Sequence, residues 1–206
     1  TPERTAASVG EFAAAMSSHG AKPDQMRLAA IDMSAAYQKG LREHLPKAEI
    51  VFDHFHVMQL AGKAVDEVRK QLQREGVTLK GALWALRGNA SRLSQAQLQL
   101  RHDICARQKE LGRAMALRES LQDTWQWPSA TGAELHLTAW CSWAVRSRLA
   151  AFKQLAQTLK RHWDGILSYY PHRITSAAIE SINSIIQTAR RRARGFRNFD
   201  NLKAIC

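Results

Sequence analysis

The stretch MRLAAIDMSAAYQKGLREHLPKAEIVFDHFHV, residues 26–57, decides the fold class. It holds two short apolar runs, 26–31 and 48–52, and each is followed by an aspartate and then by a helical pattern. Pro46 ends the first helical pattern, because proline cannot continue a helix. The order strand, helix, strand, helix predicts two parallel strands joined by a right-handed crossover.

Asp32 and Asp53 follow the two predicted strands directly. Ligands of parallel sheets bind at the carboxyl ends of the strands, so either carboxylate could be functional. Either could equally be an N-cap, since aspartate at a strand-to-helix junction accepts backbone N–H groups. His56, three residues after Asp53, could bring an imidazole to the same helix start. One such pair is a weak metal signal, because structural zinc takes four ligands, and a buried hydrogen-bonded histidine is equally compatible.

Helical periodicity dominates the rest of the chain. It predicts an α/β part at 1–75, an all-helical insertion at 76–170 and a C-terminal segment at 171–206 that carries one more helix. The last helix of the insertion is expected to run from Phe152 through Leu167 without a break and to end at Pro171. The six tryptophans are expected to lie mostly in the core, since aromatic side chains dominate core packing.

The stretch SAAIESINSIIQTARRRARGFR, residues 176–197, combines one carboxylate with a basic cluster. Glu180 is not a capping-box glutamate, because position 177 is alanine, although a favourable first-turn charge is an alternative. Asn183, one turn further, could bind solvent, a phosphate or a metal shell. The basic residues form either a solvated surface or a phosphate-binding segment. The dense spacing of the arginines favours the phosphate-binding segment. They are Arg190, Arg191, Arg192, Arg194 and Arg197.

The charge balance favours a polyanionic partner. Thirty Lys and Arg residues face eighteen Asp and Glu residues, a formal charge of +12. Nucleic acid is a better match than a membrane, because no stretch approaches the roughly 20 apolar residues of a membrane-spanning helix. The three cysteines are widely spaced, which supports neither a disulfide framework nor a zinc pattern and fits a reducing cytoplasm.

Three motifs in order, AIDMS at 30–34, DHFHV at 53–57, and Glu180 followed by RRRARGFRNFDN, resemble the catalytic region of bacterial insertion-sequence transposases of the DDE class, ISL-three lineage. The resemblance covers nearly the whole chain. It implies a partial ribonuclease-H-like core, with two parallel strands and helices, interrupted by a helical insertion. It also implies a DNA substrate and a homo-oligomer in the full-length protein.

The resemblance further assigns roles to residues. Asp32 matches the second acidic residue of the triad and Glu180 the third, and both would bind Mg²⁺ or Mn²⁺. Asp53, His56 and Asn183 would support the site. The implied chemistry is DNA strand cleavage and strand transfer by two-metal phosphoryl transfer.

The chain departs from the family pattern at two places. Ser181 stands where members usually carry glycine, a change that a helix tolerates. The first aspartate of the triad is expected on a strand upstream of Thr1, so we expect this chain alone to be inactive or very weak. Two other readings stay open: a non-catalytic DNA-binding remnant of a transposase, and a helical scaffold whose charge is incidental.

Overall fold

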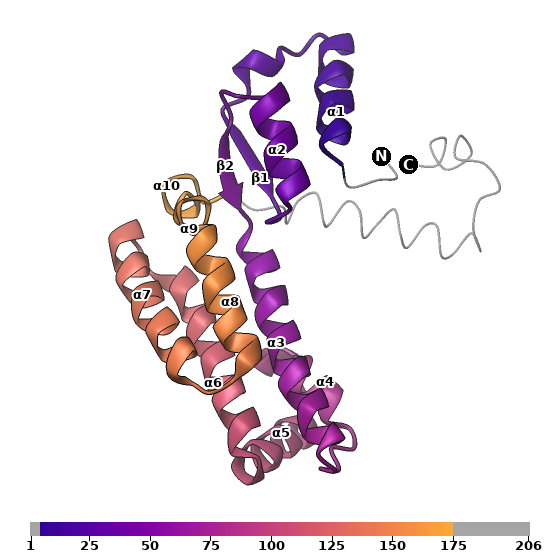
Figure 1. Cartoon of the computed structure of the whole chain (residues 1–206), viewed down its shortest axis with the longest axis vertical. Coiled ribbons are helices and arrows are strands. Elements are labelled where there is room, and N and C mark those ends of the chain that lie inside the picture. Colours follow the sequence, from indigo (N-terminus) through magenta and orange to yellow (C-terminus); the bar gives the residue numbers. More distant parts are fainter. Residues whose placement is uncertain (1–4, 175–206) are drawn as a thin grey trace, which may run out of the picture.

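The sheet consists of two parallel strands. The computed structural model describes residues 5–174 (Figure 1) and shows β1 (Leu28–Ile31) paired with β2 (Glu49–Phe52). Leu28 lies opposite Glu49, and Ile31 lies opposite Phe52. Helix α2 (Ala35–His44) connects the two strands. The parallel pair with a helical connection, predicted from residues 26–57, is confirmed.

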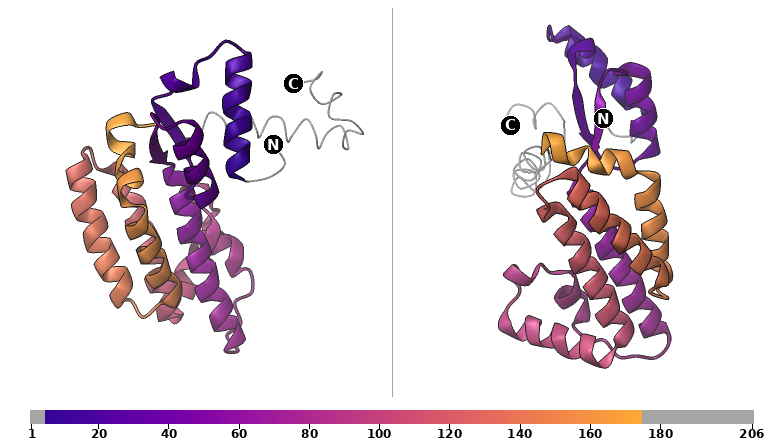
Figure 2. Two further views of the ribbon diagram at one scale, coloured as in Figure 1. Left: turned by 45° about the horizontal axis from the view of Figure 1, so that its top comes forward. Right: turned by 90° about the vertical axis from the view of Figure 1, so that its left-hand side faces the viewer.

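Helix α1 (Ala6–Ser18) packs against α2 beside this sheet (Figure 2). Thr5 caps α1 by accepting the Ser8 N–H. A small apolar core of Val9, Leu41 and Leu45 lies between the two helices and the sheet. Gly40 permits the close approach, because a Cβ at this position would lie 2.7 Å from the backbone oxygen of Ala6.

Helix α3 (His54–Arg74) leads away from the sheet and enters the helical part of the molecule (Figure 1). Its 21 residues span about 31 Å. Its buried face comprises Val57, Ala61, Ala64, Val65, Asp66, Val68 and Leu72. The helical spacing of apolar residues predicts a stripe of Val57, Leu60, Ala61, Ala64, Val68 and Leu72, and all of these except the partly exposed Leu60 are buried. This face packs against α6 and α8, so α3 belongs both to the end of the sheet and to the helical core.

Helices make up the remainder of the described chain after α3, and no strand occurs there. They are α4 (Ala82–Arg87), α5 (Gln95–Arg107), α6 (Lys109–Asp123), α7 (Ala130–Arg146), α8 (Ala150–Arg161), α9 (Trp163–Leu167) and α10 (Tyr169–His172). The shared core contains Trp140 and Phe152, and the Trp140 indole donates a hydrogen bond of 2.7 Å to the Leu117 carbonyl. Within residues 5–174, no helix is long and apolar enough to cross a membrane.

Two expectations about these helices are wrong. The helix from Phe152 does not continue to Pro171, because His162 leaves the helical region with φ −115° and ψ 23° and separates α8 from α9. Pro171 lies within α10. The turn lets Gly165 of α9 pack against the Phe52 ring of β2.

The tryptophans are also less buried than expected. Trp125 and Trp140 are in the core. Three others are exposed, with exposed fractions of 69% for Trp84, 41% for Trp127 and 37% for Trp143. Exposed aromatic surface on a basic protein is available for contact with a partner.

Gly165 and Gly62 are both helical glycines, and we expect alanine to act on them in opposite directions. A Cβ at Gly165 would lie 2.5 Å from the buried Phe52 ring, so Gly165→Ala should lower the free energy of unfolding by about 1–3 kcal/mol. A Cβ at Gly62 meets nothing within 4 Å, so Gly62→Ala should raise it by roughly 0.5–1 kcal/mol. Urea unfolding followed by tryptophan fluorescence measures both. Equal stability of Gly165→Ala and the wild type would refute this packing.

Candidate active site

Asp32 lies directly after β1, at the carboxyl end of the sheet. Its Oδ1 accepts a 3.0 Å hydrogen bond from the Ser34 N–H. The bond holds the carboxylate in the turn that leads into α2. Asp32 is not the N-cap of α2, because Ser34 occupies that position. Asp32 nevertheless remains partly exposed, and its side chain borders a cavity.

This cavity, which we call the Asp32 pocket, has a volume of about 390 Å³. It lies where the end of β1 meets the first turns of α3 and the end of α8, three elements that approach one another in Figure 1. Its polar lining consists of Asp32, Ser34, His56, Gln59, Lys63, Thr158 and His162. The three residues from α3 are spaced by three and four positions, which places them on one helix face. A carboxylate, two imidazoles, an ammonium group and hydroxyls therefore surround one space.

Asp53 has a different position, although it follows β2 as Asp32 follows β1. It is 1% exposed and caps α3, where its Oδ1 accepts the Phe55 N–H at 2.9 Å. Its own N–H donates to the Ile31 carbonyl at 3.2 Å, which extends the contact between the strands. Asp53 does not line the Asp32 pocket, whereas His56 does. The structure thus shows the capping role for Asp53 and brings His56, not Asp53, to the pocket with Asp32.

His54, rather than His56, stands beside the Asp53 carboxylate, with 3.6 Å between Nδ1 and Oδ1. Its ring lies 5.5 Å from that of Trp125 and 5.3 Å from that of Tyr169. Tyr170 follows in the same cluster and donates its hydroxyl to the Thr124 carbonyl, and burial raises the pKa of Tyr170 to about 12. These aromatic contacts fix the start of α3 and, with it, the orientation of the pocket wall.

His162 closes the pocket from the end of α8. Its ring packs edge-on against Phe52 with 5.1 Å between centroids. Burial and, to a smaller extent, the Arg161 charge lower the pKa of His162 below its usual value of 6.5. The imidazole is therefore neutral at pH 7, when it can donate one hydrogen bond and accept another.

Asp32 is the one residue lining this pocket that offers carboxylate oxygens, which are the ligands that hard divalent cations prefer. Within residues 5–174, no three His, Cys, Asp or Glu side chains are grouped so that they could hold a metal ion. Glu180, Asn183 and the five arginines from Arg190 to Arg197 lie outside the described residues. The structure therefore places Asp32 and His56 together and Asp53 outside their pocket, whereas the predicted site residues from Glu180 onward lie beyond the described part of the chain.

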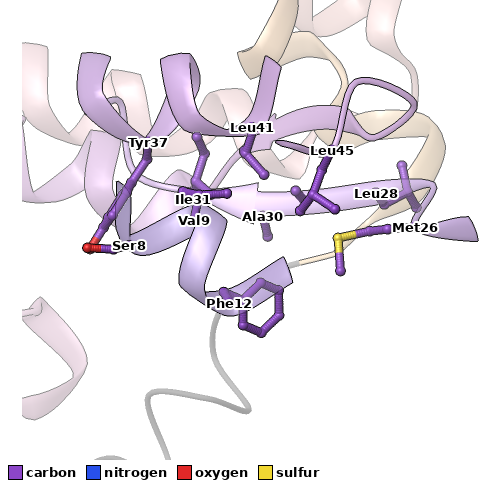
Figure 3. Close-up of a pocket in the computed structure, with 11 residues that line it drawn as sticks. Ser8, Val9, Phe12, Met26, Leu28, Ala30, Ile31, Tyr37, Leu41 and Leu45 are labelled. Atoms are coloured by element: carbon purple, nitrogen blue, oxygen red, sulfur yellow. The ribbon is translucent and has the colours of Figure 1, made fainter. Parts of the chain in front are cut away.

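A second cavity, of about 300 Å³, lies between α1, β1 and α2 (Figure 3). Its lining is apolar except for Ser8 and Tyr37, and Figure 3 shows Phe12, Met26 and Leu45 around it. It offers no ionised group to a phosphate or a metal ion, so it is a poor candidate for the phosphoryl transfer that the resemblance implies.

Five polar residues of the Asp32 pocket are absent from the sequence-based site: Ser34, Gln59, Lys63, Thr158 and His162. Gln59 and Lys63 had a usable signal, since they follow His56 on the same face of a predicted helix. No sequence signal points to His162, because 130 positions separate it from Asp32. Only the turn after α8 brings His162 to the Asp32 pocket.

Known transposases resemble this chain over most of its length. A family model described as Transposase, of the ISL3 type of DDE transposases, matches residues 1–206. The transposase for insertion sequence element IS1001 of Bordetella parapertussis is 31% identical over 182 residues, 84% of this chain and 45% of that protein. The transposase for insertion sequence element IS1557 of Mycobacterium tuberculosis is 35% identical over 127 residues, 62% of this chain and 28% of that protein.

No solved structure matches the chain. The chain spans less than half the length of these two relatives. The family match nevertheless covers every residue, and the motifs that suggested the resemblance lie within it. The chain belongs to the ISL3-type family of DDE transposases.

Proposed function

We propose that this chain is the catalytic region of a DNA transposase that cleaves and joins DNA strands by two-metal phosphoryl transfer. The observation that carries the proposal is the Asp32 pocket, in which a carboxylate at the carboxyl end of a parallel strand meets basic and neutral polar side chains. We propose that Asp32 is the second acidic residue of the family's triad. A ribonuclease-H-like core interrupted by a helical insertion is part of the proposal. The β1–α2–β2 unit followed by α3 to α8 supports it.

Asp32 and Glu180 are the proposed metal ligands, with Mg²⁺ or Mn²⁺ as the ion. Bound divalent ions supply Lewis acidity for the attack of water or a DNA 3′-hydroxyl and for the departure of the leaving oxygen. Asp32 fits this role because it offers hard oxygen ligands in a partly exposed position and its turn is fixed by the Ser34 N–H. Glu180 would add the next carboxylate.

The remaining pocket residues would hold the DNA rather than the metal. The Lys63 ammonium attracts a phosphate without holding it in one fixed geometry. His162, neutral at pH 7, and Thr158 can hydrogen-bond phosphate oxygens. His56 stands on the same face of α3 and is proposed as a supporting residue together with Asn183. Asp53 is proposed to support the site indirectly, because it caps the start of α3, the helix that carries His56.

DNA is the proposed partner, and we propose that the full-length protein acts on it as a homo-oligomer. The formal charge of +12 and the arginines from Arg190 to Arg197 support DNA binding. A non-catalytic DNA-binding protein would share this property, so DNA affinity does not separate the two functions. Metal binding does.

Mn²⁺ titration calorimetry tests the proposed metal ligands. We expect Asp32→Asn and Glu180→Gln each to weaken Mn²⁺ binding by about tenfold or more, because losing even an outer-shell partner of a metal costs roughly 10–100-fold. Asp123→Asn, a change of the same kind at an exposed position at the end of α6, should leave the affinity unchanged. Equal Mn²⁺ affinity in all four proteins would favour the non-catalytic function.

The arginine segment should contact DNA phosphates. The double substitution Arg191→Ala/Arg194→Ala should reduce the slope of log K against log salt by about 0.9 for each lost phosphate contact with a duplex. Arg74→Ala/Lys109→Ala removes the same charge from exposed helix ends and is the control. Fluorescence anisotropy of a labelled duplex at several salt concentrations measures both. Equal slopes in the two variants would contradict a specific role for the segment.

Strand cleavage by the isolated chain tests the predicted dependence on an upstream aspartate. The 206-residue chain should show little or no Mg²⁺-dependent nicking of a labelled DNA. Efficient nicking that Glu180→Gln abolishes would show that the chain is active by itself.

A further inference from the structure

Another cavity, lined by basic and apolar side chains, adjoins the Asp32 pocket along α3. This cavity, the Arg118 pocket, has a volume of about 380 Å³ and lies among α3, α4 and α6. Three basic residues, Lys63, Arg87 and Arg118, line it together with Phe55 and Met58, and no acidic residue does. Three positive charges around one space favour an anionic ligand.

Arg118 is the most constrained of these cations. Its Nη1 and Nη2 donate to the carbonyls of Leu86 and Arg87, at 3.1 and 3.2 Å, at the carboxyl end of α4. Its Nε is buried and has no hydrogen-bond partner among the described residues. Burial and, to a smaller extent, the Arg101 charge lower the pKa of the Arg118 guanidinium. The Glu119 carboxylate opposes this shift only in part, because its ion pair is with Arg101. An anion in the pocket would stabilise this charge.

The other two cations are also incompletely neutralised. Lys63 forms no ion pair with any described residue and is exposed. Arg87 lies 3.4 Å from Asp66, but Asp66 also contacts Arg69 at 2.7 Å and Lys70 at 3.4 Å. Three positive charges thus share this one carboxylate, and Arg87 keeps half of its side chain in solvent.

Gly62 forms part of the pocket wall in the middle of α3. Glycine within a helix is unfavourable, and packing gives no reason for it here, since a Cβ would meet nothing within 4 Å. The missing side chain instead leaves space in the pocket beside Lys63. A larger residue at this position would occupy that space without disturbing the core.

Two exposed aromatic side chains lie on the helices that carry Lys63 and Arg87. Phe55 lines the pocket at the first turn of α3 and is 45% exposed. Trp84 is 69% exposed and stands one turn before Arg87 on α4, whose buried side carries Ala82, Ala85 and Leu86. Residues three apart on a helix are neighbours, so Trp84 stands beside Arg87 on α4, although Trp84 itself does not line the pocket.

The two pockets share a wall. Gln59 and Lys63 of α3 line both the Asp32 pocket and the Arg118 pocket. From Phe55 to Lys63, α3 rises by about 12 Å along this wall. A flexible polyanion that enters the Asp32 pocket can therefore continue across α3 to Arg118.

We propose that the Arg118 pocket binds an unpaired stretch of the DNA strand that leaves the Asp32 pocket. Its phosphates contact Lys63, Arg87 and Arg118, and its bases stack on Phe55 and Trp84. Exposed aromatic side chains near cations suit a single strand, because its bases expose faces for stacking that a duplex keeps inside. The proposal rests on the proposed function, which supplies the DNA.

Fluorescence anisotropy with the 206-residue chain tests it, using a labelled oligothymidine and a labelled duplex of equal length. Trp84→Ala and Phe55→Ala should each weaken oligothymidine binding by about 5- to 100-fold and change duplex binding less than about twofold. Lys63→Ala should lower the salt slope for oligothymidine by about 0.7. Gly62→Leu should keep the folded state and weaken oligothymidine binding, because it fills the pocket.

Matched controls are Trp143→Ala on α7 and Lys153→Ala on α8, both exposed and outside the two pockets. They should leave oligothymidine binding unchanged. If the wild type binds DNA but the pocket variants bind oligothymidine like the controls, the inference is wrong and the proposed function stands. If the wild type binds neither the oligothymidine nor the duplex, the inference and the proposed function both fail. Trp84-dependent sedimentation with phosphatidylserine vesicles would assign the surface to a membrane and overturn the inference.

Discussion

The packing of one face of α3 determines how the rest of the molecule is arranged. Val57, Val65, Val68 and Leu72 are almost fully buried against α6 and α8. Complete burial of such a side chain contributes about 1.5–3 kcal/mol, whereas an exposed ion pair such as Lys39–Glu43 contributes about 1 kcal/mol or less. Apolar contact along α3 therefore sets the angle at which the helical part meets the sheet, and Asp53 fixes the residue at which α3 begins.

Because this apolar face of α3 packs into the core, the polar side chains of α3 lie on its other faces. His56, Gln59 and Lys63 face Asp32 and His162 across one pocket, while Phe55 and Gly62 border the next. The turn after α8 adds His162 because Gly165 allows α9 to lie against Phe52. A structural requirement, close packing on β2, thus brings a neutral imidazole to the carboxyl end of β1. Binding groups on rigid elements are well placed to orient the proposed DNA substrate.

Local patterns were sufficient to predict the β1–α2–β2 unit, the buried stripe of α3 and the position of Asp32. They fail where distant segments decide the outcome. The continuous helix after Phe152 breaks at His162, since contact with Phe52 outweighs an unbroken helical pattern. Periodicity alone does not show that Trp84 faces solvent, because burial depends on which helices pack beside α4. His162 and Arg118 join their pockets only through tertiary structure, so no spacing in the sequence pointed to them.

The account depends most on Asp32 and Glu180 binding the same metal ion. Fe²⁺ can take the place of Mg²⁺ at oxygen ligands and, with ascorbate and peroxide, generates radicals that cut the backbone nearby. The account predicts cuts next to both Asp32 and Glu180 in the folded chain, which excess Mg²⁺ suppresses together. Cuts at only one of the two positions, or cuts at both that excess Mg²⁺ leaves unchanged, would contradict a shared metal site.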